Sequence, residues 1–122
     1  MSSPTLGTCT VYFDGACPIC RREIAHYRTR EGAADISWVD VTASGAAELG
    51  TDLDRDAALA RLHVRREDGS LVSGAEAFAT LWGNLPAYAW LGRIAAWGPV
   101  LFVLEVGYRG FLRARRLWRP AP

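Results

Sequence analysis

The sequence predicts an α/β fold in which a β-α-β unit, a further helix and a β-β-α unit follow in order, with two helices after them. Short runs rich in β-branched and aromatic residues alternate with segments whose apolar residues recur at helical spacing. The 122 residues suit one core, and half of them are hydrophobic, which is enough for the chain to fold. Residues 1–122 are therefore expected to form one domain, with a core over 8–83 and a helical extension over 86–118.

The first predicted strand covers residues 8–13, a run dense in Val, Tyr and Phe. A helix is expected over 18–30, with Gly32 as its stop, because apolar residues share one helical face. Those residues are Cys20, Ile24 and Tyr27. A second strand over 36–41 should lie parallel to the first, because a helical crossover joins the two.

Residues 42–60 give the weakest pattern. A short helix is expected over 46–49, and a longer one over 53–60 with Asp52 as its N-cap.

A β-hairpin is predicted next, with strands over 62–66 and 70–73 joined by Glu67-Asp68-Gly69. A helix over 75–82 follows, with Glu76 in its first turn. This order of elements is that of the thioredoxin fold.

The extension is predicted to contain two helices, over 88–97 and 100–118, broken at Gly98-Pro99. The second carries an apolar stripe, Leu101, Leu104, Tyr108 and Leu112, and then a group of arginines, Arg109, Arg113, Arg115, Arg116 and Arg119. Arginines suit the last turn of a helix, and we expect a solvated helix end there. The extension has more apolar residues than one amphipathic helix face needs. The surplus belongs either to the core, which is the favoured interpretation, or to an interface for a partner or membrane surface.

The segment Asp14-Gly15-Ala16-Cys17-Pro18-Ile19-Cys20 places two cysteines at the start of the first helix. A thiol is nucleophilic as the thiolate, and a helix N-terminus stabilises that anion. Pro18 suits the first helical position, where no amide donor is needed. One helical turn brings Cys20 close enough to Cys17 to form a disulfide. We therefore predict a dithiol redox site, with Cys17, nearer the helix end and more exposed, as the nucleophile and Cys20 as the resolving thiol.

Asp14 is the third residue of this site. Its carboxylate either exchanges a proton with the thiols through water or holds the loop that presents Cys17, and an Asx turn is compatible with both roles. Gly15 is expected to allow a tight turn and a close backbone approach. Asp40, at the end of the second strand, is either a cap or a further site residue.

The strand-Asp-Gly-x-Cys-x-x-Cys pattern followed by Arg21-Arg22-Glu23 resembles the DCC family of thiol-disulfide oxidoreductase-like proteins, named for its Asp-Cys-Cys signature. Later segments resemble it in order and spacing: Leu62-His63-Val64-Arg65, Asp68-Gly69, Gly74-Ala75-Glu76-Ala77-Phe78 and Leu81-Trp82. The resemblance spans about residues 9–118. It implies a thioredoxin-like fold and thiol-disulfide exchange, with no bound organic cofactor because the dithiol itself carries the electrons.

One departure concerns the cis-proline that thioredoxin-like enzymes usually place before their third strand, where it exposes backbone for substrate pairing. Residues 57–62 contain no proline, and Ala60 or Arg61 takes its place. Either the substrate groove is built differently or the protein is a weak general reductase.

Several polar side chains near the motif have two readings. Arg21 and Arg22 could stabilise a thiolate or attract an acidic substrate such as glutathione, but a solvated helix face is the simpler interpretation. Glu23 could shuttle protons or form a surface helical pair, and His26 and His63 are expected to be structural.

The main rival to the redox reading is a metal site, for zinc or for iron as an iron–sulfur cluster. Cys17 and Cys20 would bind the metal together with Cys9, His26 or His63. The chain has no second Cys-x-x-Cys to complete such a site, and Cys9 is otherwise expected to be a buried apolar group. We therefore predict no metal ligands.

Charge and composition limit the partners. A net charge of +1 argues against a general nucleic-acid binder, and the absence of Lys excludes Schiff-base chemistry. We expect a protein or low-molecular-weight thiol or disulfide as substrate, glutathione being one candidate. Three cysteines and no signal-like N-terminus favour a reducing cytoplasm. The longest uncharged apolar stretch, 94–104, is about half of what a bilayer span needs, so no transmembrane helix is expected.

Overall fold

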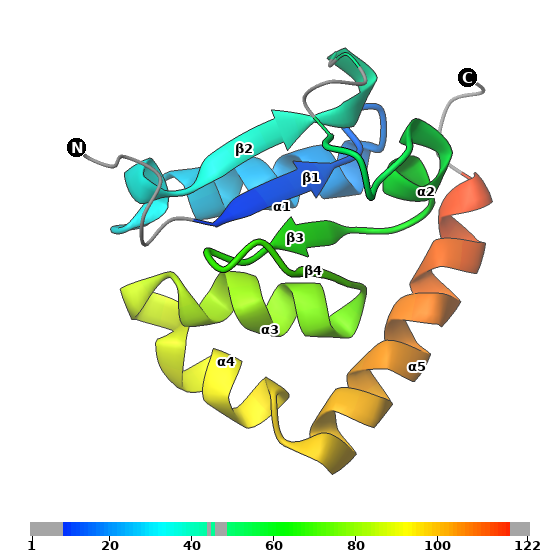
Figure 1. Ribbon diagram of the computed structural model, residues 1–122. Helices are drawn as coiled ribbons and strands as arrows, with labels where there is room; N and C mark the ends of the chain where they lie inside the picture. The colour runs from blue at the N-terminus through cyan, green and yellow to red at the C-terminus, as the bar shows by residue number, and fades with distance from the viewer. Residues whose placement is uncertain (1–8, 44, 46–48, 118–122) are drawn as a thin grey trace.

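A four-stranded sheet with the strand order β2-β1-β3-β4 organises the protein (Figure 1). The computed structural model describes residues 9–43, 45 and 49–117. β1 pairs in parallel with β2 and antiparallel with β3, and β3 pairs antiparallel with β4. In chain order the elements are β1 (Thr10–Phe13), α1 (Pro18–Arg28), η1 (Ala33–Asp35), β2 (Ser37–Asp40), η2 (Val41–Ala43), α2 (Arg55–Ala60), β3 (His63–Arg65), β4 (Leu71–Ser73), α3 (Ala75–Gly83), η4 (Pro86–Tyr88), α4 (Ala89–Ala95), α5 (Gly98–Ala114) and η5 (Arg115–Leu117), where η marks a short 3-10 helix.

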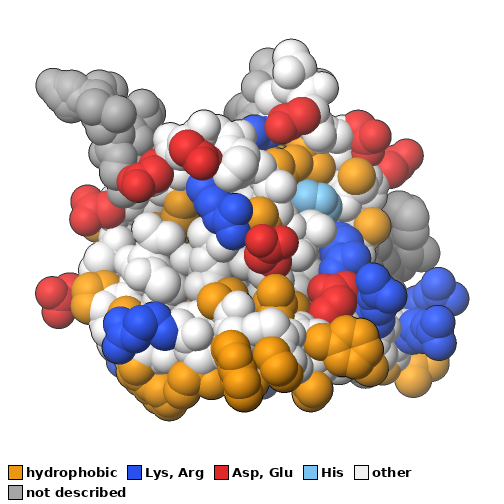
Figure 2. Space-filling model, turned by 60° about the horizontal axis from the view of Figure 1, so that its bottom comes forward, with side chains coloured by type: hydrophobic (Ala, Val, Ile, Leu, Met, Phe, Trp, Pro, Cys, Tyr) orange, Lys and Arg blue, Asp and Glu red, His pale blue; other side chains and the backbone are white. Residues whose placement is uncertain are grey.

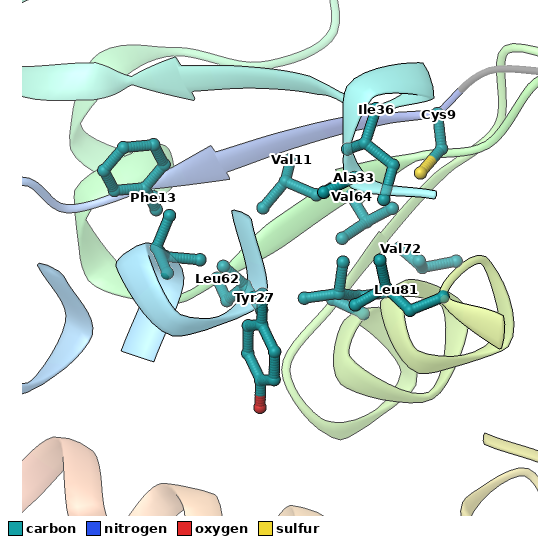
Figure 3. Close-up of a cluster of buried hydrophobic side chains, with 13 residues drawn as sticks. Cys9, Val11, Phe13, Tyr27, Ala33, Ile36, Leu62, Val64, Val72 and Leu81 are labelled. Carbon is teal, nitrogen blue, oxygen red and sulfur yellow. The ribbon is translucent and has the colours of Figure 1, made fainter. Parts of the chain in front are cut away.

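The two faces of β1 belong to two hydrophobic clusters, because successive side chains of a strand point to opposite sides. Val11 and Phe13 join the larger cluster with residues of α1, β3, β4 and α3 (Figure 3). Tyr12 joins the smaller cluster on the other face, with Val41, Leu49, Leu53 and Ala58. Helices α1 and α3 thus cover one face of the sheet, and α2 with the segment before it covers the other.

The predicted β-α-β unit is confirmed, including the parallel pairing of its strands. α1 begins at Pro18 as expected and ends at Arg28, shortly before Gly32, which has a φ of 90°. The predicted hairpin and the helix after it are also confirmed as β3, β4 and α3. The result is the thioredoxin-like order of elements, followed by a helical C-terminal part.

The N-cap predicted for α2 is wrong. α2 begins at Arg55, and its N-cap is Asp54, whose Oδ1 accepts the Ala57 amide hydrogen at 2.7 Å. Asp52 instead pairs with Arg65, with its Oδ1 2.6 Å from Nη2. Asp52 and Asp54 both suit an N-cap by residue type. The Asp52 carboxylate is bound by Arg65, and Asp54 caps the helix. The short helix predicted over 46–49 falls mostly on residues outside the described part of the chain.

The C-terminal helices form a sharp corner. A break between two helices is confirmed, but it lies at Ala96 and Trp97, because α4 ends at Ala95 and the predicted Gly98-Pro99 forms the first turn of α5. The two arms, Pro86–Ala95 and Gly98–Leu117, are bent by 99°. α5 then runs from this corner past the end of α3 to α2 (Figure 1). No single helix in the described residues is long and apolar enough to cross a membrane, although the two bent arms together pass a test of length and composition.

The predicted apolar stripe of α5 is confirmed as its inward face. Tyr108 packs edge-on against Phe78 of α3, with ring centroids 5.3 Å apart. Its hydroxyl accepts the Leu62 amide hydrogen at 2.7 Å, and burial raises the pKa of Tyr108 to about 12. α5 is thereby attached to the start of β3.

Candidate active site

Three chain segments meet at one edge of the sheet. β1 ends there at Phe13, opposite Asp40 at the end of the parallel strand β2. β3 runs the other way, so it begins at the same edge, where His63 pairs with Tyr12. The turn that carries the cysteines therefore lies beside the end of β2 and the junction between α2 and β3.

Cys17 is the N-cap residue of α1. Its backbone is extended, with φ −83° and ψ 118°, and Pro18 occupies the first helical turn as predicted. The Cys17 Sγ accepts the amide hydrogen of Cys20 at 3.4 Å. A thiolate at this position would gain both from that amide and from the helix dipole.

The relative exposure of the two thiols is opposite to the expectation. Cys17 is 0% exposed, whereas Cys20 is partly exposed, and both are free thiols. The physical reason is the direction of the Cys17 sulfur, which turns toward the amide of its own helix rather than toward solvent.

The pKa of Cys20 is raised to about 12, first by desolvation and then by its hydrogen bond to Cys17 and the nearby Cys17 charge. Arg115 acts in the opposite direction and lowers it. Cys20 therefore holds its proton and can donate it toward Cys17.

Asp14 is buried at 4% exposure and has two roles in the turn. Its Oδ1 accepts the amide hydrogen of Ala16 at 3.0 Å, which is the Asx turn considered from the sequence, and its carbonyl accepts the amide hydrogen of Cys17 at 3.2 Å. Its Oδ2 lies 3.6 Å from Nη1 of Arg115. The carboxylate thus holds the turn and pairs with a cation from the far end of the chain.

Asp40 fastens the same turn from β2. Its Oδ1 accepts the amide hydrogen of Gly15 at 3.1 Å and the hydroxyl and amide hydrogens of Thr42 at 2.6 and 3.0 Å. A Cβ on Gly15 would overlap the Asp40 carboxylate, so glycine is needed there for close approach, as predicted. Asp40 is a cap and a support of the thiol turn.

A cavity of about 40 Å³ lies beside Cys20 and extends between α1, α3 and α5. Among its lining residues are Cys20, Glu23, Phe78, Tyr108, Phe111 and Arg115. Burial raises the pKa of Glu23, although a hydrogen bond from the Tyr27 hydroxyl, at 3.2 Å, lowers it in part. Glu23 is therefore a carboxylate in the same enclosed space as Cys20, not only a surface helical residue.

Side chains from the C-terminal part of the chain bond to the backbone of residues 59–62. This is the segment on which thioredoxin-like enzymes would pair a substrate. The described residues contain no cis peptide bond. The carbonyls of Leu59 and Ala60 accept hydrogen bonds from Nη2 of Arg115 at 2.5 and 3.1 Å. The amide of Leu62 donates to Tyr108. Among the described residues, C-terminal side chains therefore bond to the backbone that a cis-proline enzyme would expose, and the choice between a different groove and a weak general reductase stays a prediction.

Arg115 and Tyr108 were missed as site residues. The arginines near the end of α5 were expected in solvent, but Arg115 is 8% exposed and contacts Asp14 and the α2–β3 junction. A sequence signal existed, because Arg115 follows Tyr108 by seven residues, two helical turns, and so continues the inward stripe. Arg113 and Arg116 are exposed, as predicted.

The remaining polar residues near the motif are structural in their contacts. Arg21 is exposed and donates from Nη1 to the carbonyl of Gly15 at 3.2 Å, and Arg22 is exposed. His26 bonds to the Tyr88 hydroxyl at 2.6 Å. His63 is buried, which lowers its pKa, and its Nδ1 lies 2.9 Å from the Arg61 carbonyl.

Among the described residues, no group of side chains supports the metal-site alternative. Cys9 is buried in the larger hydrophobic cluster, as expected, and desolvation raises its pKa to about 11. In the described part of the chain, no three His, Cys, Asp or Glu side chains come together in a group that could hold a metal ion.

A thioredoxin-like domain with two cysteines on the first turn of its first helix defines a class of dithiol proteins. The chain belongs to the DCC1-like thiol-disulfide oxidoreductase family, whose model matches residues 11–120. It is also 30% identical over 98 residues to an uncharacterized chloroplastic protein of Arabidopsis thaliana. That match covers 79% of this chain and 45% of the relative, so the chain spans about half of the relative's length. No solved structure matches the chain.

Proposed function

We propose that the protein is a thiol-disulfide oxidoreductase that exchanges two electrons through a Cys17–Cys20 dithiol. The observation that supports this most is the placement of both sulfurs on the first turn of α1, with Cys17 accepting the amide hydrogen of Cys20. Family membership supports the general redox role. The electrons pass through the dithiol, so the reaction needs no organic cofactor.

In the proposed reaction, the Cys17 thiolate attacks one sulfur of a substrate disulfide. A mixed disulfide forms, and the other substrate sulfur leaves as a thiolate, which takes a proton. Cys20 then attacks the Cys17 sulfur, so that the Cys17–Cys20 disulfide forms and the second substrate thiol leaves. The substrate gains two electrons and two protons, and a thiol such as glutathione or a reductase protein restores the dithiol.

The second step needs a proton acceptor, because burial raises the pKa of the Cys20 thiol and keeps it protonated until it attacks. Glu23 lines the same cavity as Cys20, and its own pKa is raised. A carboxyl with a raised pKa can take the Cys20 proton through a water molecule and release it to solvent. Asp14 supports the site by holding the thiol turn.

Access to the thiols restricts the substrate. Cys17 is fully buried, and the cavity beside Cys20, about 40 Å³, holds little more than water. A glutathione-sized or protein substrate therefore requires the C-terminal turn around Arg115 to move aside. A reducing compartment suits a dithiol of this kind, and the cytoplasm is the compartment that the sequence favours.

A second role, docking through the C-terminal helices, is favoured by the large apolar side chains that α4 and α5 expose. It does not compete with thiol exchange, because these side chains lie toward the other end of α5 from Arg115.

The test is a redox titration of metal-free protein in graded thiol buffers, with alkylation and intact mass as the readout. We expect a reversible two-electron transition between about −120 and −270 mV, the range of known dithiol enzymes. It should be lost in Cys17→Ser and Cys20→Ser and kept in Cys9→Ala, the matched control in the hydrophobic core. If no Cys17–Cys20 disulfide forms in oxidising buffer, the proposed function is wrong.

A further inference from the structure

Six large apolar side chains form an exposed patch at the corner between α4 and α5. Trp90, Ile94 and Trp97 are 55%, 49% and 65% exposed, at helical spacing. Phe102, Val103 and Val106 follow on the first half of α5 at 70%, 65% and 54%. We call these six residues the corner patch. In Figure 2 the orange side chains gather along the lower rim, where α4 and the start of α5 lie.

The six side chains of the corner patch are not core residues, because other faces of α4 and α5 make the contacts with the rest of the protein. The opposite face of α4 is already used, because Gly92 and Ala95 are buried and Gly92 packs against the backbone of α3. The inward face of α5 is used by Tyr108 against Phe78. The expectation that the apolar surplus of the extension is mainly core is therefore wrong for the corner patch. Contiguous exposed apolar groups of this size indicate a contact surface.

The exposed charges of α4, α5 and η5 are mainly positive, and the exposed Glu76 of α3, which lies beside Phe102, is paired with Arg66. Residues 86–117 contain five arginines and one acidic residue, Glu105, in a chain whose net charge is only +1. Glu105 adds little negative potential, since Arg61 and Arg109 both pair with it at 2.5 and 2.8 Å. Arg93, Arg113 and Arg116 are exposed, and blue side chains lie at both ends of the apolar rim in Figure 2.

We propose that the corner patch docks the protein on an anionic membrane surface. Trp side chains are favoured at the boundary between lipid headgroups and hydrocarbon, where the ring is buried and its N–H stays hydrated. Arginines beside such a patch pair with anionic headgroups. A neutral surface would use only the apolar half of this chemistry, whereas an anionic bilayer uses both the apolar patch and the arginines.

The geometry favours lying on the bilayer over crossing it. The 99° bend prevents the two arms from forming one straight span, and the inward face of α5 is attached to α3 and β3 through Tyr108. α5 has 17 residues and is thus about 25 Å long. The corner patch lies at its start and the thiol site at its end, so the dithiol stays outside the lipid.

The test is flotation of the full chain with phosphatidylcholine vesicles, alone or with about 30% phosphatidylglycerol. We expect binding to the anionic vesicles that weakens with salt, together with a blue shift of Trp fluorescence. Trp97→Ser and Phe102→Ser should each lower the partition coefficient roughly tenfold, the loss expected for one large apolar side chain. Ile19→Ser, an exposed apolar position on α1, is the matched control and should bind as the parent does.

Five results would overturn the proposal. The parent protein could fail to bind anionic vesicles, or bind neutral ones equally well. The Trp97→Ser, Phe102→Ser double variant could bind like the parent while circular dichroism shows both folded. A dimer in light scattering that this double variant abolishes would assign the surface to a second copy of the chain. Resistance to alkaline carbonate extraction would assign the helices to the bilayer interior. None of these measurements depends on the thiols.

Discussion

The guanidinium of Arg115 lies 3.6 Å from the carboxylate of Asp14, although the two residues come from opposite ends of the chain. Both are buried, at 8% and 4% exposure. The same guanidinium donates to the carbonyls of Leu59 and Ala60. The Arg115 side chain therefore links the end of α5 to the thiol turn and to the α2–β3 junction. These contacts hold the C-terminal part of the chain beside the dithiol.

The first prediction concerns stability. Arg115→Met should lower the free energy of unfolding by about 3 kcal/mol, because it removes the buried ion pair with Asp14 and the hydrogen bonds to the carbonyls of Leu59 and Ala60. Urea denaturation measures the loss, and Arg116→Met, at an exposed neighbour, should stay within about 0.5 kcal/mol of the parent. Asp14→Asn added to Arg115→Met should cost less than it does alone. Strict additivity of the two changes would contradict the pairing.

The second prediction concerns access to the buried thiol. Releasing Arg115 frees the C-terminal turn, so Cys17 should be alkylated faster by a small iodoacetamide reagent in Arg115→Met than in the parent. Peptide mass spectrometry after timed quenching resolves Cys17 from Cys20. Arg116→Met should leave the rate unchanged. Equal Cys17 rates in the parent and in Arg115→Met would mean that another part of the chain controls access.

The local features of the site could be predicted because they depend on neighbours in sequence. A Cys at the N-cap, a Pro after it and an Asx turn before it are set by residues within one turn of each other. The contacts of Arg115 could not be predicted from the sequence, because they depend on where the C-terminal end of α5 packs. The same limit explains the wrong cap of α2, since the partner that removes Asp52 is Arg65 on another strand.

The third prediction concerns the acidity of Cys20. Its pKa is raised to about 12 by burial, by the hydrogen bond to Cys17 and by the Cys17 charge. Cys17→Ser keeps an N-cap oxygen and removes the charge, so the pKa of Cys20 should fall below that value but stay above the ordinary 9.0, because burial remains. The pKa of Cys20 is measured from the far-ultraviolet absorbance of the thiolate as a function of pH, in a Cys9→Ala background. A pKa at or below the ordinary value would show that burial is not the main cause.

The fourth prediction concerns Glu105, which joins α5 to the start of α3. Burial opposes its ionisation, but hydrogen bonds from Arg61, from the Ala75 amide and from Arg109 prevail and lower its pKa to about 2. A carboxyl with a lowered folded pKa stabilises the protein above its ordinary pKa, here 4.5, and loses that effect as the pH falls toward about 2. Glu105→Gln should therefore cost about 1–2 kcal/mol at pH 7, after allowance for solvent screening.

Urea denaturation of this variant at pH 7 and at two points below 4.5 tests the pH dependence. The difference from the parent should shrink as the pH falls. Glu76→Gln is the control, because its pairing with Arg66 is between exposed side chains and should be worth less than about 1 kcal/mol at any pH. A difference for Glu105→Gln that does not change with pH would mean that lost packing, not charge, is responsible.

The last prediction concerns the backbone that carries the thiols. Gly15→Ala should lower the free energy of unfolding by about 1–3 kcal/mol, because the new methyl group overlaps the Asp40 carboxylate and pushes the turn off β2. Gly110→Ala is the matched control, since it lies in the interior of α5 with no heavy atom near the added carbon, and it should raise stability by about 0.5–1 kcal/mol. Disulfide formation in oxidising buffer should slow in Gly15→Ala and keep its parent rate in Gly110→Ala. If Gly15→Ala changes stability but not that rate, Asp40 supports the fold without positioning Cys17.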